Sequence, residues 1–170
     1  KVASMDAGKD ELVGKVMELC AKESKPLIIS LGGKSDDFVE KLVTKIKDKK
    51  LDAFLLHTVS MYPTPDGKSN IGYISHLKNK FGSENIKIGY SGHEVGYAPS
   101  VLAAVQGAQM IERHFSLTRD WKIHHIGCAL TPEEYREMNS LIDRILLESS
   151  AGLTEFHKEE LEFLKDMKYT

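Results

Sequence analysis

The sequence contains few of the features that mark several common protein classes. Its only two cysteines, Cys20 and Cys128, form no CxxC pair, so neither a disulfide framework nor a cysteine metal centre is indicated. A reduced, cytoplasmic protein is therefore the simplest expectation. No apolar run approaches the length of a membrane span, and we expect no membrane partner. The formal net charge is only −2, so we also expect no nucleic-acid partner, because phosphate backbones attract strongly basic surfaces.

The composition is that of an ordinary globular protein. The 170 residues are 41% hydrophobic and 28% charged, which suits one domain with a substantial core. The chain starts in a strand-like run, residues 1–4, without an initiator methionine. We therefore expect the N-terminal part of a longer protein to precede it.

Strand-like and helical segments alternate along the chain. Strands are expected at residues 1–4, 27–31, 53–59, 86–90 and 110–115. Helices are expected at residues 9–23, after the cap Ser35, from 71 to 81, at 101–109 with Pro99 in the first turn, from the capping box at Thr131 to 147, and at 154–168. Repeated β-α units of this kind give a parallel sheet, because a parallel return needs a crossover.

Two α/β architectures fit this alternation, an open doubly wound sheet and part of an eight-unit barrel. Five units with a missing front end favour the last five β/α units of a (β/α)8 TIM barrel. Residues 1–150 would then form the barrel segment, and residues 151–170 a terminal amphipathic helix. In either architecture the functional atoms gather at the carboxyl ends of the strands.

Each expected strand ends in small hydroxyls or titratable groups. In order they are Ser4 and Asp6, Ser30 before Gly32 and Gly33, Ser60 and Tyr62, Ser91 and His93, and His114 and Ser116. Any one of these serines could be a turn residue or a helix cap. Their convergence on one rim is what indicates a site.

His93 and His114 stand out at this rim. They follow neighbouring parallel strands, about 5 Å apart, and two imidazoles so placed suit one divalent cation with open positions for water or substrate. Two histidines satisfied by core or turn hydrogen bonds remain the alternative. The other candidates His57, His76 and His157 are expected to be structural.

Three stretches in order carry a resemblance to a known family. They are "HTVSMYPTP" (57–65), "IGYSGHEVGYAPSVLAAVQGAQMIERHFSL" (88–117), and a Trp-Lys pair that leads to "LTPEE" (130–134). Together with "KVASMD" (1–6) and "PLIISLGG" (26–33), they make the chain resemble the sialic acid synthases up to about residue 148. That family includes the synthases for N-acetylneuraminate, legionaminate and pseudaminate.

The resemblance implies a barrel enzyme that condenses phosphoenolpyruvate with the open-chain aldehyde of a 2-acetamido sugar. It implies Mn²⁺, or another divalent metal such as Mg²⁺, on His93 and His114. By the same resemblance Lys1, Ser4, Ser30 and Ser91 fall on positions that hold the phosphate and carboxylate of phosphoenolpyruvate, and Ser60 and Tyr62 on the sugar site. Asp6 takes the place of an acidic active-site residue.

The sequence departs from the family pattern at "WKIHHIGCAL" (121–130). The family has an Asp-His pair here, and His125 falls on the Asp position, or His124 and His125 on the pair after a one-residue slip. His125 could still donate a proton or bind the metal. The family's first barrel half and its small C-terminal domain have no counterpart here, so we expect no activity from this chain alone. The family is typically dimeric, which makes a homodimer possible.

Two other functions fit the same residues. One is a non-catalytic barrel segment for assembly or sugar binding, which the loss of the carboxylate at residue 125 favours. The other is a metal-dependent sugar aldolase or isomerase, which would use the histidines without phosphoenolpyruvate. Lys1, Ser4, Ser30 and Ser91 would have no shared purpose in the latter.

Overall fold

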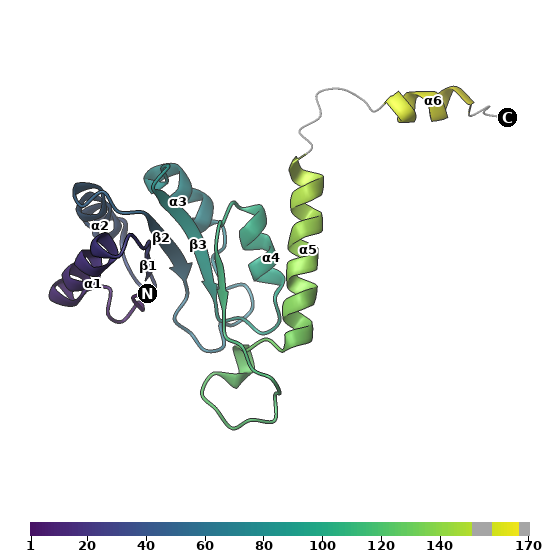
Figure 1. Ribbon diagram of the computed structural model, residues 1–170. Helices are drawn as coiled ribbons and strands as arrows, with labels where there is room; N and C mark the ends of the chain where they lie inside the picture. Colours follow the sequence, from purple (N-terminus) through teal and green to yellow (C-terminus); the bar gives the residue numbers. More distant parts are fainter. Residues whose placement is uncertain (151–157, 167–170) are drawn as a thin grey trace.

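The computed structural model describes residues 1–150 and 158–166 (Figure 1). Strands and helices alternate along the chain up to the last strand. The strands are β1 Leu27–Ser30, β2 Ala53–Thr58, β3 Ile86–Gly92 and β4 Ile111–Arg113. The helices are α1 Asp10–Lys22, α2 Asp36–Asp48, α3 Tyr73–Phe81, α4 Ala98–Val105, the short η1 Ile126–Cys128, α5 Pro132–Ser150 and α6 Lys158–Asp166.

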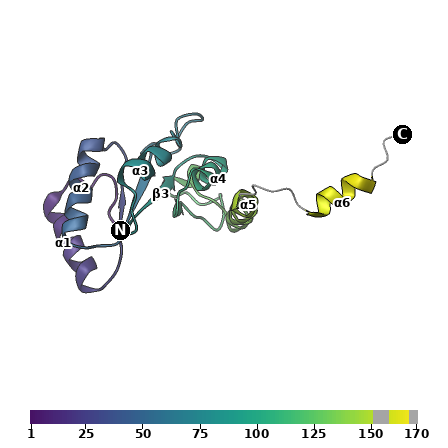
Figure 2. The same cartoon turned by 90° about the horizontal axis from the view of Figure 1, so that it is seen from above.

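The strands of the described residues form one parallel sheet in the order β1-β2-β3-β4. The sequence order and the spatial order agree, because each helix carries the chain back to the start of the neighbouring strand. The view from above shows the helices arranged around the outside of the strands (Figure 2).

One ion pair, between residues at opposite edges of the sheet, shows that the sheet is curved. Val2 forms an isolated bridge with Ile29 and so lies next to β1, at one edge of the sheet. Glu112 lies in β4 at the other edge. Four strand spacings would separate these positions by about 19 Å in a flat sheet. Lys1 Nζ nevertheless lies 2.6 Å from Glu112 Oε2. The sheet therefore curls, and the Lys1–Glu112 pair crosses its concave face.

The first expected strand is shorter than predicted. Val2 keeps both ladder hydrogen bonds, from its N–H to Ile28 O and from Ser30 N–H to its own carbonyl. The chain then turns, because the N–H groups of Asp6 and Ala7 both donate to Ala3 O. Residues 1–4 thus contribute a single bridge in place of a full strand.

Local signals in the sequence account for several helix ends. Ser35 caps α2 by accepting a hydrogen bond from Phe38 N–H at 3.3 Å. Thr131 and Glu134 form a reciprocal capping box at the start of α5, with N···O distances of 2.8 and 3.3 Å. Pro99 lies in the first turn of α4, where its missing N–H is not needed.

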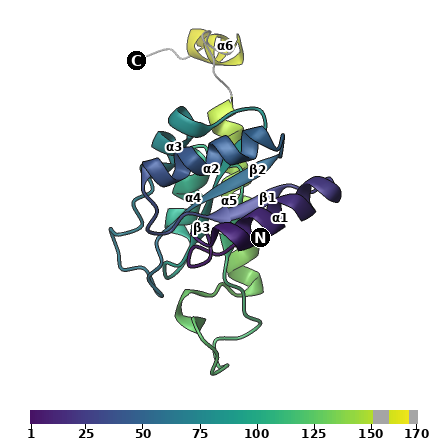
Figure 3. The same ribbon diagram turned by 90° about the vertical axis from the view of Figure 1, so that its left-hand side faces the viewer.

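The main core lies between the sheet and helices α1 to α3. Its fully buried members include Met17, Ile29, Ile46, Leu55 and Leu77. A second, smaller cluster joins α4 and α5 through Val101, Leu130 and Met138. Figure 3 shows how the segment between β4 and α5, which carries η1, projects from the sheet. No helix among the described residues combines the length and apolar character needed to cross a membrane.

The expected last helix falls only partly within the described residues. Residues 158–166 form α6, whereas residues 154–157, His157 included, and residues 167 and 168 lie outside the described part of the chain. The helix expected at 101–109 begins earlier and ends at Val105. Strand β4 is shorter than expected, and beyond it Phe115 bridges to Leu130.

Candidate active site at the carboxyl ends of the strands

Four aromatic rings meet at the carboxyl ends of β2, β3 and β4. Tyr62 lies with its ring centroid 4.1 Å from that of His93 and 4.1 Å from that of His125. His114 lies 5.3 Å from both His93 and His125 by the same measure. The structure therefore brings together two histidines and a tyrosine expected at the rim, along with His125 from the segment before η1.

His93 is held by the backbone of the neighbouring strand end. Its side chain is buried, and its Nδ1 donates a hydrogen bond of 2.8 Å to Val59 O. A carbonyl accepts only, so Nδ1 carries the proton and Nε2 presents its lone pair. Burial lowers the pKa of His93 below its ordinary value of 6.5, although the Val59 hydrogen bond opposes that shift. His93 is therefore neutral near pH 7.

His114 is neutral for related reasons. Burial lowers its pKa below 6.5, and the nearby imidazoles of His93 and His125 lower it further. Neutral imidazoles are the form that binds metal ions, because the lone pair must be free. His57, in β2, is placed differently from these two histidines. Its Nε2 donates to Ser69 O at 2.8 Å inside the core, as expected for a structural histidine.

The donors at the rim fit a cation bound by two imidazoles. Within residues 1–150 and 158–166, no three His, Cys, Asp or Glu side chains form an arrangement ready to hold an ion. His93 and His114 can each offer a lone pair, and their ring centroids lie 5.3 Å apart. The hydrogen bond from His93 to Val59 O is the kind of outer contact that fixes a metal-binding ring.

Lys1 and Glu112 place opposite charges beside these rings. Burial alone would raise the pKa of Glu112, but the hydrogen bond and charge of Lys1, together with a hydrogen bond to Ser91, lower it below 4.5. Glu112 therefore stays ionised and fixes the ammonium group on the concave face. Sequence reasoning missed Glu112, although its place two residues before His114 in a strand puts both side chains on one face.

The serines at the ends of the first strands surround a tight turn. Gly32 N–H donates to Ser4 Oγ at 2.9 Å, so the Ser4 hydroxyl proton remains free for another acceptor. A Cβ at position 32 would lie 2.8 Å from both Ser4 Oγ and Thr58 Cγ2 and would also meet Ser60, so only glycine fits there. Ser60 lines a hollow of about 310 Å³ beside this turn.

Ser30 is the last residue of β1. Its hydroxyl is buried and makes no hydrogen bond within the described structure. A buried polar group without a partner carries an energetic penalty, which a bound ligand atom can remove. Asp6, by contrast, pairs with Lys9 at 2.7 Å in the turn before α1.

Sequence reasoning also missed the polar network under the rim. Glu94 and Arg113 form an ion pair of 2.9 Å whose side chains are 3% and 0% exposed. Tyr90 and Ser100 donate their hydroxyl hydrogens to the two oxygens of Glu94, at 2.9 and 2.7 Å. The signal available was that Glu94 and Arg113 stand next to the two histidines, one after His93 and one before His114.

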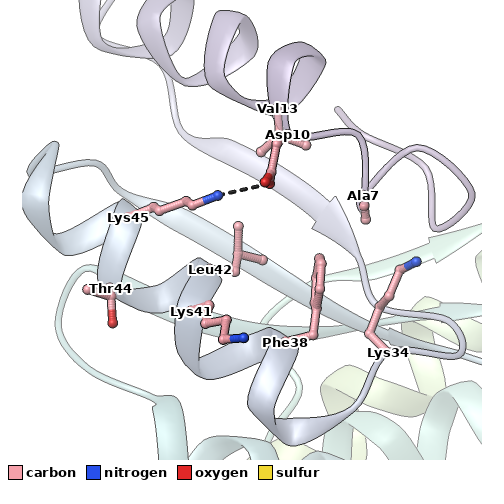
Figure 4. A pocket seen from close by; sticks show the side chains of 10 residues that line it. Ala7, Asp10, Val13, Lys34, Phe38, Lys41, Leu42, Thr44 and Lys45 are labelled. Carbon is pink, nitrogen blue, oxygen red and sulfur yellow. Dashed lines mark hydrogen bonds and ion pairs between the residues drawn. The ribbon is translucent and has the colours of Figure 1, made fainter.

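A second hollow lies between α1 and α2 on the helical side (Figure 4). It measures about 570 Å³ and combines apolar residues such as Phe38 with Lys34, Lys41 and Lys45. Lys45 pairs with Asp10 across it at 2.8 Å. None of the residues predicted for the active site lines this groove, so the rim remains the candidate site.

A curved parallel sheet with helices outside and polar groups at its carboxyl ends defines a segment of a (β/α)8 barrel protein. The family model described as the NeuB family matches residues 1–168, and the chain belongs to that family. The resemblance to sialic acid synthases is thereby confirmed.

Relatives and solved structures agree with this assignment. The chain is 36% identical over 150 residues to N-acetylneuraminate-9-phosphate synthase of Drosophila melanogaster, covering 88% of this chain and 39% of that protein. It is 33% identical to pseudaminic acid synthase of Campylobacter jejuni, covering 81% of this chain and 38% of that protein. The chain thus spans about two fifths of the length of these curated relatives.

A solved structure extends the match to the fold. The N-acetylneuraminic acid synthetase of Leptospira borgpetersenii, in complex with citrate, superimposes with a TM-score of 0.81 at 29% identity. The match covers 96% of this chain and 55% of that one. The expected partial barrel is therefore confirmed.

Proposed function

We propose that this chain provides the metal-binding surface and part of the phosphoenolpyruvate-binding surface of a synthase of nonulosonic acids, the sugar class that includes sialic acid. The observation that carries the proposal is the grouping of neutral His93 and His114 with Tyr62, beside the ammonium group of Lys1. Membership of the NeuB family supports it, as do relatives named as N-acetylneuraminate-9-phosphate and pseudaminic acid synthases.

The proposed reaction joins two substrates and consumes one water. C3 of phosphoenolpyruvate attacks the aldehyde carbon of an open-chain 2-acetamido sugar, which forms a C–C bond and turns the aldehyde oxygen into a hydroxyl once it gains a proton. Water then adds at C2 of the former phosphoenolpyruvate and loses a proton. Phosphate leaves as its C2–O bond breaks, and the 2-keto acid product remains.

Lys1 and the rim serines are proposed to bind the two anionic groups of phosphoenolpyruvate. The Lys1 ammonium supplies charge, and hydroxyls supply directed donors. Ser4 has its proton free, and the Ser30 hydroxyl has no hydrogen-bond partner among the described residues. Ser91 lies next to Glu112 in the sheet register and extends the same surface.

His93 and His114 are proposed to hold Mn²⁺ or another divalent cation such as Mg²⁺. When bound, the cation would supply Lewis-acid polarisation of the aldehyde oxygen. The ring of Tyr62 lies against His93 and His114 and would position the sugar beside them. His125, in contact with Tyr62, would deliver the proton that the aldehyde oxygen gains. Asp6 and Ser60 would contact the substrates from the ends of their turns.

A non-catalytic role is the second candidate. His125 stands where the family has an aspartate, and its side chain is exposed. A barrel segment without that carboxylate could bind a sugar or a partner without turning it over. This role predicts no effect of the chain on phosphoenolpyruvate.

Metal and phosphoenolpyruvate binding by the chain itself tests the proposal. We expect calorimetry to show Mn²⁺ binding that His93→Ala and His114→Ala abolish. His76→Ala is the matched control, because it removes an exposed imidazole that lies in α3 and pairs with Asp36 at the start of α2. Failure of the unmodified chain to bind Mn²⁺, or equal binding by all variants, would overturn the enzymatic assignment.

Phosphorus NMR of phosphoenolpyruvate then tests the second half of the proposal. Chain-bound Mn²⁺ should broaden the phosphate resonance beyond the effect of the same Mn²⁺ concentration with His93→Ala. Ser30→Ala should reduce this broadening while Mn²⁺ affinity is unchanged. Mn²⁺ binding without any effect on phosphoenolpyruvate would favour a metal-dependent aldolase or isomerase, or the non-catalytic role.

A further inference from the structure

The guanidinium group of Arg113 connects segments that are distant in the sequence. Its Nη1 donates to Glu94 Oε1 at 2.9 Å, to Gly96 O at 2.8 Å and to Ser100 Oγ at 3.0 Å. Its Nη2 donates to Glu94 O at 2.8 Å and to Cys128 O at 3.1 Å. One buried side chain therefore holds the turn after β3, the start of α4 and the segment of η1.

Two of these segments, the turn after β3 and the segment of η1, carry histidines of the candidate site, and the third histidine directly follows Arg113 itself. Glu94 directly follows His93, and Arg113 directly precedes His114. Cys128 N–H donates to His125 O at 3.1 Å, so fixing the Cys128 carbonyl also fixes the backbone of His125. The three histidines thus depend on a single fixed point beneath them.

The backbone at Gly92 is adapted to this ion pair. Gly92 pairs with Arg113 in the sheet register. A Cβ at position 92 would lie 2.6 Å from Glu94 Oε2, 2.7 Å from Tyr90 Cε1 and 3.0 Å from Arg113 Cδ. The glycine of the Ser-Gly-His turn is therefore needed because the ion pair occupies the space of a side chain.

The chemistry of the pair favours arginine over lysine. A planar guanidinium reaches several acceptors in fixed directions, whereas an ammonium group on a flexible stem cannot match all of them. The Nε of Arg113 is buried and has no hydrogen-bond partner among the described residues, so the Nη contacts set the placement of the side chain despite that penalty. Dense packing transmits a shift of such a group to its neighbours.

We propose that Arg113, paired with Glu94, is a positioning residue that sets the geometry of His93, His114 and His125 for metal binding. This inference rests on the proposed function for its metal readout, but the ring geometry can be tested without metal. The side chains of Arg113 and Glu94 are buried beneath the rim, and both act through the backbone segments that they hold.

The test compares Mn²⁺ affinity in Arg113→Lys and Glu94→Gln with that of the unmodified chain. We expect each variant to lose about tenfold or more in affinity, the usual effect of removing an outer contact that orients metal-binding side chains. Leu77→Ala, on the buried face of α3, is the control for general destabilisation. It should lower the melting temperature and leave Mn²⁺ affinity unchanged.

A metal-free readout accompanies the affinities. Tyr62 should give strong nuclear Overhauser effects to the rings of both His93 and His125, which lie at equal centroid distances. In Arg113→Lys and Glu94→Gln these effects should weaken, whereas in Leu77→Ala they should persist.

Failure of the two proposals can be distinguished. If the unmodified chain binds no Mn²⁺, the proposed function fails, and the ring contacts alone decide the role of Arg113. If the unmodified chain binds Mn²⁺ and both pair variants bind it equally well with unchanged ring contacts, the positioning role is overturned. Equal losses in Leu77→Ala and in the pair variants would overturn it as well.

Discussion

Two carboxylates of this chain, Glu94 and Asp36, each collect hydrogen bonds from several side chains, but in different surroundings. Glu94 lies under the rim with a side chain that is 3% exposed, and it accepts from Tyr90, Ser100 and Arg113. Asp36 begins α2 with a side chain that is 28% exposed, and it contacts Tyr73, His76 and Lys80. The number of partners is similar, whereas the access of water is not.

This difference decides what each cluster can do. Water screens the partners of Asp36 and can replace any of them, so the loss of one partner leaves a solvated charge. Around Glu94 no water can replace a missing partner, and an unpaired charge there is strongly unfavourable. The buried network around Glu94 can therefore fix the geometry of a site, whereas the exposed cluster around Asp36, at the start of α2, cannot.

The largest expected effect comes from breaking the buried pair. Arg113→Met leaves Glu94 buried and uncompensated, and should lower the free energy of unfolding by about 3–5 kcal/mol. The double variant Glu94→Met/Arg113→Met removes both charges and should recover much of this loss. Urea denaturation measures both. A double variant as unstable as the single one would show that charge burial is not the cause.

A glycine exchange under the rim should have the next largest effect. Gly92→Ala forces a methyl group against Glu94, Tyr90 and Arg113 and should lower the free energy of unfolding by about 1–3 kcal/mol. Gly14→Ala is the matched change in α1, where a Cβ meets nothing within 4 Å. It should stabilise by about 0.5–1 kcal/mol, because alanine favours helix over glycine. Thermal denaturation of the two variants should therefore give shifts of opposite sign.

Lowering the pH should reduce the stability of the folded chain, because its buried histidines resist protonation. Burial lowers the pKa values of His57, His93 and His114 in the folded chain below 6.5. The unfolded chain therefore takes up protons first as the pH falls through 6.5, and the stability that these groups provide is present above that pH and lost below it. We expect the melting temperature to fall between pH 7.5 and about 5.5.

His57→Gln tests which histidine dominates this slope. Glutamine can still donate to Ser69 O but does not titrate, so the decline in melting temperature should become shallower. An unchanged slope would assign the pH dependence to His93 and His114 instead.

Local features of this fold could be read from the sequence. The cap at Ser35, the capping box at Thr131 and the proline at the start of α4 depend on residues within one turn of each other. The buried strands followed from their apolar runs. The meeting of His93 and His114 followed from the rule that parallel strands end on one edge.

The missing features depend on contacts between distant segments. Arg113 and Cys128 meet through the loop after β4, and Lys1 reaches Glu112 only because the sheet curls. Nothing in the spacing of these residues encodes the degree of curvature. The close packing of Tyr62 against His125 likewise depends on how the segment before η1 folds back over the rim.

The smallest expected effect concerns the exposed cluster and can be seen in one tyrosine. Partial burial, followed by the hydrogen bond to Asp36 and its negative charge, raises the pKa of Tyr73 to about 12. Asp36→Asn removes the charge but not the burial, so the pKa of Tyr73 should fall part of the way toward 10.0. Carbon NMR of labelled tyrosine would measure this change, with the melting temperature almost unaffected because Asp36 is solvated. A large loss of stability in Asp36→Asn would contradict the contrast with Glu94, since it would mean that the surface cluster also supports the fold.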